Sequence, residues 1–213
     1  MKKAFIFLLI ISIISFPLSA FAQENEKLNM FTDTIGHWAE GYINEVVELG
    51  FFKGTGDNLF NPDDRVSRAQ FMTVLYRMSG AYETDKATPF LDISLQPEEF
   101  KNAISWGYNS GYISGVSETE FDPEGFLTRE AAMKILFQYS GGQSGGEILF
   151  TVVYDDLFLD SDYISDWAKP CVYWGVYNKL ISGTEPKILN PNAAVTRAQL
   201  AKILIEYYNY FNY

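Results

Sequence analysis

One short pattern recurs three times along this 213-residue chain, and this internal repeat restricts the fold more than any other feature. Each copy has Phe or Leu, then Asn or Asp, then proline, and an arginine follows the proline after six residues. The three copies occupy residues 60–70, 121–131 and 189–199, so the arginine recurs after 61 and then 68 residues. Such a period predicts one supersecondary unit per copy, with neighbouring units packed against one another.

The segment after each proline is predicted to begin a helix. Ser67 with Gln70, and Thr196 with Gln199, have the spacing of an N-terminal capping box. Apolar residues then recur at i, i+3, i+4 and i+7, which is one stripe of an α-helix. Three such stripes can bury one another around a common axis. The stripes are Phe71, Val74, Leu75 and Met78; Ala132, Ile135, Leu136 and Tyr139; and Leu200, Ile203, Leu204 and Tyr207.

An earlier helix is predicted in each unit. It begins near Trp38 or Trp167 and ends near Leu49 or Asn178, and Pro170 in its opening turn is tolerated there. A glycine follows each first helix, six residues before the Phe or Leu of the repeated pattern, and is suited to a tight turn. These glycines are Gly54, Gly115 and Gly183. Each unit is therefore helix, loop, helix.

The N-terminal segment has the layout of a secretory signal peptide. Lys2 and Lys3 precede an apolar run to Ala20, and Ala20-Phe21-Ala22 is a cleavage site. The retained-anchor alternative is disfavoured because the run is short for a membrane span. The predicted order is signal peptide 1–22, linker 23–30, repeats 31–80 and 90–140, flexible linker 141–153, and repeat 154–213.

Composition excludes several kinds of site. The formal net charge of −11 argues against nucleic acid as a partner, and no membrane association is expected after signal cleavage. The single cysteine, Cys171, cannot form a disulfide within the chain and is expected to be a small buried side chain. The single histidine, His37, has no Cys or His companions, so neither a metal site nor a cofactor is predicted.

The repeated motifs resemble the S-layer homology domain family. The family pattern has an F-x-D opening, a W-A helix start, an apolar pair before a glycine, an F-x-P element and a T-R-A-E/Q helix start. All three copies carry the last three elements, with Leu189 replacing the aromatic residue in the third. The F-x-D openings are Phe31-Thr32-Asp33, Phe90-Leu91-Asp92 and, more loosely, Tyr154-Asp155-Asp156. Copy two departs from the pattern because Glu99-Phe100 replaces W-A.

The resemblance implies a fold and a function. The fold is all-α, with three helix-loop-helix repeats forming a pseudo-threefold trimer around a central three-helix bundle. The function is non-covalent anchoring of a secreted protein to the cell wall. The partner is an anionic secondary cell-wall polysaccharide, often carrying pyruvate ketals in this family, bound in the grooves between repeats. The implied ligand-binding residues are Arg68, Arg129, Arg197, Trp38, Trp167, Gly54, Gly115 and Gly183, and the candidate site also includes Asp33, Asp92 and Asp156. Packing in the core is an equally open interpretation of the two tryptophans.

The arginines have two interpretations. Each is expected at the first position of a helix, where a cation is mildly unfavourable and an anion is attracted by free backbone N–H groups. A bound carboxylate would resolve this conflict, because Arg can grip it bidentately. The alternative is a salt bridge between repeats, to the Asp of an F-x-D opening. Those residues are Asp33, Asp92 and Asp156.

Two other functions were weighed against wall binding. A glycoside hydrolase needs two carboxylates across a groove, but the acidic clusters at Glu98-Glu99, Asp155-Asp156 and Asp160-Ser161-Asp162 do not recur between copies. The last cluster also lacks the loop of an EF-hand calcium site. The other alternative is a structural module that associates with an envelope protein without binding glycan. A non-catalytic wall-binding protein is the favoured prediction.

Overall fold

The computed structural model describes residues 30–81, 87–142 and 157–211. Across these ranges the chain forms six α-helices, one short 3₁₀ helix and isolated backbone bridges in place of strands, so the all-α prediction is confirmed. The predicted signal peptide (1–22), most of the linkers 23–30 and 141–153, and Asp156 lie outside the described residues. The helices are α1 (Glu40–Glu48), α2 (Arg68–Ser79), α3 (Glu98–Asn109), α4 (Arg129–Tyr139), η2 (Ser161–Tyr163), α6 (Lys169–Tyr177) and α7 (Arg197–Phe211).

The second helix of each repeat begins where the caps predict. Ser67 accepts a hydrogen bond from the Gln70 backbone N–H, and the Gln70 side chain accepts one from the Ser67 N–H, which completes the predicted capping box. Thr196 and Gln199 make the same reciprocal pair. The sequence therefore predicts the first residue of these helices well, because the cap is a local interaction.

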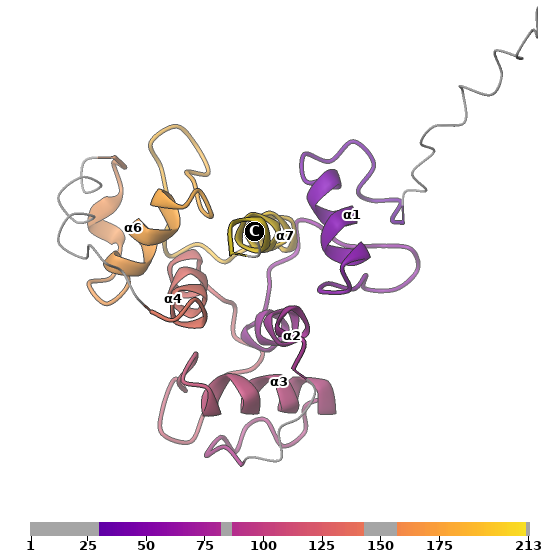
Figure 1. Ribbon diagram of the computed structural model, residues 1–213, viewed down its shortest axis with the longest axis vertical. Coiled ribbons are helices and arrows are strands. Elements are labelled where there is room, and N and C mark those ends of the chain that lie inside the picture. Colours follow the sequence, from indigo (N-terminus) through magenta and orange to yellow (C-terminus); the bar gives the residue numbers. More distant parts are fainter. Residues whose placement is uncertain (1–29, 82–86, 143–156, 212–213) are drawn as a thin grey trace, which may run out of the picture.

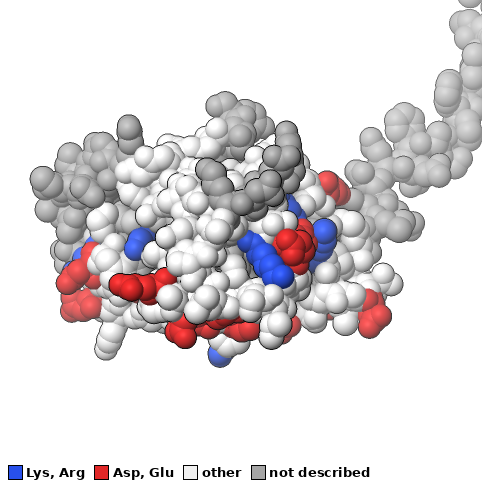
Figure 2. All heavy atoms as spheres, turned by 90° about the horizontal axis from the view of Figure 1, so that it is seen from below, with Lys and Arg blue, Asp and Glu red and all other residues white. Residues whose placement is uncertain are grey.

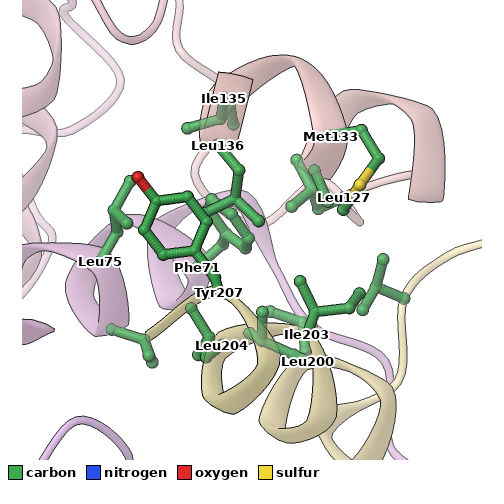
Figure 3. Close-up of a cluster of buried hydrophobic side chains, with 14 of the residues drawn as sticks. Phe71, Leu75, Leu127, Met133, Ile135, Leu136, Leu200, Ile203, Leu204 and Tyr207 are labelled. Atoms are coloured by element: carbon green, nitrogen blue, oxygen red, sulfur yellow. The ribbon is translucent and has the colours of Figure 1, made fainter. Parts of the chain in front are cut away.

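The second helices α2, α4 and α7 lie around the centre of the molecule, seen nearly end-on in Figure 1, with α1, α3 and α6 outside them. Figure 3 shows side chains from all three central helices pointing toward one another, including Leu75, Leu136 and Leu204. All three of these leucines are fully buried. The predicted apolar stripes thus form a shared core.

Each first helix packs against the second helix of the preceding repeat. Helix α3 packs on α2, α6 packs on α4, and α1 packs on α7 at the other end of the chain. The three lobes in Figure 1 are therefore each built from two repeats. The repeats do not form separate beads, because each one gives a helix to its neighbour.

Where two paired helices meet, a large residue on one helix faces a glycine on the other in two of the three lobes. A side chain at Gly107 of α3 would overlap Met72 of α2, and one at Gly175 of α6 would overlap Met133 of α4. The corresponding pair in the third lobe is Val46 of α1 with Ala201 of α7, where the larger residue has moved to the first helix. This exchange of large and small residues keeps the core well packed in each lobe.

A closed cycle of backbone hydrogen bonds joins the three repeats just before the central helices. Val66 N–H donates to Val195 C=O over 2.9 Å, Val195 N–H to Leu127 C=O over 2.9 Å, and Leu127 N–H to Val66 C=O over 3.0 Å. Each of these residues is buried. The cycle fixes the relative position of the three helix starts, which is where the candidate site residues lie.

Several smaller predictions concern packing. Cys171 is buried, as predicted, and Trp174 on the same helix is also buried. The C-terminal aromatic residues, left open by the sequence, pack partly on the bundle: Tyr207 is buried, its ring centre is 4.5 Å from that of Phe211, and Tyr210 is exposed. Within the described ranges, no helix has both the length and the apolar character needed to cross a membrane.

Candidate functional site

The three arginines each begin a central helix and donate to backbone carbonyls of the next repeat. Arg68 Nε donates to Phe121 C=O over 2.8 Å, and its Nη2 donates to Ser114 C=O over 3.2 Å. The equivalent bonds run from Arg129 to Leu189 and Ser182, and from Arg197 to Phe60 and Lys53. The arginines therefore help to tie the repeats together, and only part of each five-donor guanidinium is used.

The N–H groups at the starts of these helices are already bonded. At α2, the Arg68 N–H donates to Gly125 C=O (2.8 Å), the Ala69 N–H to Pro123 C=O (3.0 Å) and the Gln70 N–H to Ser67 Oγ (3.2 Å). Carbonyls of the next repeat bond the first two N–H groups of α4 and α7 in the same way. The prediction that free helix N–H groups bind an anion together with the arginine is therefore wrong. Backbone carbonyls of the next repeat accept the hydrogen bonds that the anion was expected to accept.

The aspartates of the F-x-D openings bind backbone N–H groups of their own repeat. Asp33 accepts from the Phe60 N–H (2.9 Å) and Asn61 N–H (2.6 Å), and Asp92 does the same for residues 121 and 122. No ion pair joins Arg68, Arg129 or Arg197 to an aspartate in the described part of the chain. In place of the alternative salt bridge to Asp33 or Asp92, the arginines donate to backbone carbonyls and these aspartates accept from backbone N–H groups.

In the third repeat this aspartate is Asp160, in Phe158-Leu159-Asp160. Its carboxylate accepts from the Leu189 N–H (2.8 Å) and Asn190 N–H (2.7 Å), as Asp33 and Asp92 do in their repeats. The looser assignment to Asp156 placed the opening four residues too early. Spacing would have found it, because Asp160 precedes Leu189 by the same 29 residues that separate Asp92 from Phe121.

Three grooves lie beside these arginines, and each takes residues from all three repeats. Groove A is lined by Arg68 of the first repeat, by the glycine loop and α4 of the second, and by Trp167 of the third. The Lys134 ammonium lies 5.0 Å from the centre of the Trp167 ring, within the range of a cation–π contact. The residues used below are Arg68, Ser114, Gly115, Lys134, Gln138 and Trp167.

Groove B is the same arrangement moved on by one repeat. It is lined by Arg129, by the glycine loop and α7 of the third repeat, and by Trp38 of the first. Its cavity volume of about 310 Å³, against about 180 Å³ for groove A, is at the small end for ligand pockets and suits a short ligand segment. The residues used below are Arg129, Ser182, Gly183, Lys202 and Trp38.

Groove C completes the cycle with a different lining. It contains Arg197 of the third repeat, the glycine loop and α2 of the first, and Phe100 of the second. Two further cations, Lys53 and Arg77, line it, and no tryptophan does. The departure of copy two from the W-A pattern therefore falls on this groove.

The predicted tryptophans and glycines have separate roles. Trp38 and Trp167 are 58% and 50% exposed, so a large part of each indole faces solvent and can cover a sugar ring. Gly115 is required by space, because an added Cβ would overlap the Glu120 carbonyl and the Phe90 ring. Gly54 and Gly183 face the same kind of crowding from a neighbouring carbonyl. The glycines thus shape the groove wall, as their role in turns predicted.

Burial lowers the pKa of all three arginines, to about 10 for Arg129 and Arg197, because the charged form loses water. Nearby carboxylates oppose this effect, Asp160 for Arg129 and Asp33 and Asp64 for Arg197. A pKa of about 10 leaves both side chains charged at neutral pH. Each groove therefore keeps a fixed positive charge within an acidic protein.

Sequence reasoning missed the lysines of grooves A and B. Lys134 and Lys202 each lie five residues after the arginine of their own repeat, and the repeat register would have identified them. On the face drawn in Figure 2, acidic side chains gather along one edge of the molecule, and most of the basic side chains lie away from that edge. Among the described residues no cluster of His, Cys, Asp and Glu has the makings of a metal site.

A family model described as the S-layer homology domain matches residues 31–72, 89–133 and 158–201. The chain belongs to the S-layer homology domain family. The third match begins at Phe158, in agreement with Asp160 as the aspartate of the third opening. The three matches contain the three arginines and both groove tryptophans.

Parts of several much longer proteins are similar in sequence to this chain. The chain is 29% identical over 190 residues to the surface-layer 125 kDa protein of Lysinibacillus sphaericus, which covers 88% of this chain and 15% of that protein. An endoglucanase of Bacillus sp. (strain KSM-635) is 30% identical over 212 residues, covering 95% and 22%. A cellulosome-anchoring protein of Acetivibrio thermocellus is 28% identical over 120 residues, covering 54% and 26%. The chain thus spans about a quarter or less of the length of these relatives.

Proposed function

We propose that this S-layer homology chain anchors to the cell wall without catalysis, by binding an anionic secondary cell-wall polysaccharide in grooves A and B. Association with the cell surface follows from the family and from its surface-layer relatives. The observation that carries the finer proposal is the shared composition of the two grooves. Each combines an arginine, a helix lysine, a glycine loop and an exposed tryptophan.

This combination suits an acidic sugar. The arginine and lysine supply two cations for one carboxylate, and charge-assisted hydrogen bonds of this kind are worth about 1.5–3 kcal/mol each. The indole supplies a flat apolar surface for the sugar ring, and Ser114 or Ser182, next to the loop glycine, also lines the groove. The residues that line grooves A and B include no carboxylate, which is unlike the paired acids of glycoside hydrolases.

The test uses the lysines, because the arginines also hold the repeats together. The double variant Lys134→Gln and Lys202→Gln should reduce retention on purified cell wall by about tenfold or more, since each site loses a charge-assisted bond. Lys101→Gln is the matched control, because Lys101 pairs with Glu98 on α3 and lines none of the three grooves. Walls stripped chemically of their secondary polymer should retain none of these proteins.

Full retention of the double variant on intact wall, or equal retention of the unaltered chain on stripped wall, would contradict the proposal. The second result would favour association with an envelope protein.

A further inference from the structure

Groove C keeps the arginine and the glycine loop of grooves A and B, but it differs at the positions of their helix lysine and their tryptophan. The helix lysine of the other two, Lys134 or Lys202, is replaced by Thr73. The tryptophan is replaced by Glu99, which precedes Phe100 as Trp38 precedes Ala39. Two new cations appear in exchange: Lys53 where the others have serine, and Arg77 where groove A has Gln138.

The Glu99 carboxylate already binds both new cations. Its Oε1 accepts from Arg77 Nε over 2.7 Å and lies 3.7 Å from the Lys53 ammonium. Arg77 also donates to the Phe51 carbonyl over 3.4 Å, so the guanidinium is held from two sides. The hydrogen bond from Arg77 holds the pKa of Glu99 below its ordinary value, and at neutral pH this carboxylate is ionised.

The packing of two helices fixes this ion pair in place. Glu99 lies in the first turn of α3, where the helix dipole favours a negative charge. Arg77 lies in the last turn of α2, where a positive charge is favoured. Because α3 packs on α2, the Glu99 carboxylate reaches Arg77, which lines groove C. The second repeat thus supplies a carboxylate at the position where the other repeats supply an indole.

We infer that Glu99 acts as a built-in carboxylate that occupies the cations of groove C and excludes an anionic sugar, which leaves the chain with two binding sites. The inference rests on the proposed function of grooves A and B. A sugar carboxylate entering groove C must either displace Glu99 from Arg77 or lie beside it as a second negative charge. It also finds no tryptophan face to cover its ring.

The test counts sites by isothermal titration. The probe is the methyl glycoside of an N-acetylhexosamine that carries a 4,6-pyruvate ketal, and its 4,6-isopropylidene analogue is the uncharged control. The unaltered chain should bind two probe molecules. Glu99→Gln, which keeps the size and removes the charge, should bind three, and Glu99→Trp should bind three with a tighter third site. The isopropylidene analogue should bind to none of them measurably.

Two matched variants separate charge from position. Glu98→Gln removes the neighbouring carboxylate of the same helical turn, which pairs with Lys101 outside the groove, and should leave two sites. Glu99→Asp keeps the charge and should also leave two sites. Circular dichroism and a melting curve for each variant establish that the fold is retained.

The outcomes distinguish the inference from the proposed function. Two sites in both the unaltered chain and Glu99→Gln, or three in both, would overturn the role of Glu99 and leave the proposed function standing. No site in the unaltered chain with one in Glu99→Gln would overturn the function of grooves A and B and support the role of Glu99. No binding by either protein would overturn both.

Discussion

At the scale of single residues, the repeated arginine of each groove and a repeated aspartate bind opposite ends of one peptide group. Arg68 donates to the carbonyl of the peptide between Phe121 and Asp122, and Asp92 accepts from the N–H of that same peptide. The peptide is polarised from both ends, with the positive charge at its oxygen and the negative charge at its nitrogen. The same arrangement joins Arg129 with Asp160 and Arg197 with Asp33. The charges therefore stabilise each other through a peptide, without an ion pair.

The sequence predicted these residues and missed what they contact. A cation at a helix start needs a negatively charged partner, and the sequence suggested two candidates, an external anion or an aspartate of the chain. Backbone carbonyls of another repeat leave no trace in the sequence, because every residue has one. The left-handed backbone at Asn61, Asp122 and Asn190, with φ between 53° and 59°, aims those carbonyls and is detectable only from the Asn/Asp-Pro pairs.

Replacing Asp160 by Asn tests the assignment of the third opening. An amide has one oxygen and no charge, so it cannot hold both the Leu189 and Asn190 N–H groups as the carboxylate does. We expect Asp160→Asn to lower the free energy of unfolding by about 1–3 kcal/mol in urea denaturation. Asp162→Asn, two residues along and exposed, should change it by less than about 0.5 kcal/mol. Equal effects of the two variants would refute the assignment.

The Glu99–Arg77 ion pair predicts a small pH-dependent stability. Because the pKa of Glu99 is lower in the folded than in the unfolded chain, its contribution is present above the ordinary glutamate pKa and disappears as the pH falls through the folded value. The melting temperature of the unaltered chain should exceed that of Glu99→Gln at pH 7, and the two should converge below about pH 4. A difference in melting temperature that grows as the pH falls would contradict this prediction.

At the scale of helices, periodicity predicted the second helix of each repeat and its buried face. A first helix in each repeat was also predicted, without bounds in the second repeat, and the short helix η2 was not predicted. Periodicity did not predict that each first helix would pack on the second helix of another repeat. An apolar stripe shows which face of a helix is buried and does not identify the helix that buries it. The choice of partner depends on the matched sizes of residues such as Met72 and Gly107. These pairs lie in different repeats, and single-sequence reasoning had no means of connecting them.

The Met72–Gly107 contact can be tested by exchanging sizes. Ala is intrinsically favoured over Gly in a helix by about 1 kcal/mol, so Gly107→Ala would stabilise the chain if nothing lay against it. Overlap with Met72 should instead make it destabilising, by about 1–2 kcal/mol net. Adding Met72→Ala should remove that penalty, and a double-mutant cycle measures the coupling. Gly41→Ala in α1, where no neighbour lies within 4 Å, should be stabilising or neutral.

At the scale of the whole molecule, the three repeats are interlocked by shared lobes, shared grooves and shared hydrogen bonds. Each lobe takes helices from two repeats, each groove takes residues from three, and the hydrogen-bond cycle through Val66, Leu127 and Val195 has no free end. Losing one repeat would therefore disrupt every groove. A linear array of repeats, in contrast, loses only the neighbouring interface.

This organisation predicts a single unfolding transition. Far-UV circular dichroism, which follows all helices, and tryptophan fluorescence, which follows Trp38, Trp106, Trp167 and Trp174, should give coincident urea curves. The destabilising variant Asp160→Asn should shift both curves together, although it lies in one repeat. Separate transitions, or a shift in one probe alone, would show that the lobes unfold independently.

The pairing of α1 with α7 also sets an order of events in time. Of the described helices, α1 comes earliest in the sequence and packs on α7, which comes latest, and Arg197 donates to a carbonyl 137 residues earlier. Joining distant segments costs loop entropy before any contact repays it, and chains rich in such contacts fold slowly. The lobes α2–α3 and α4–α6 can assemble while the chain is still growing. The α1 lobe can form only once α7 has been synthesised, and the face of α1 that packs on α7 stays uncovered until then.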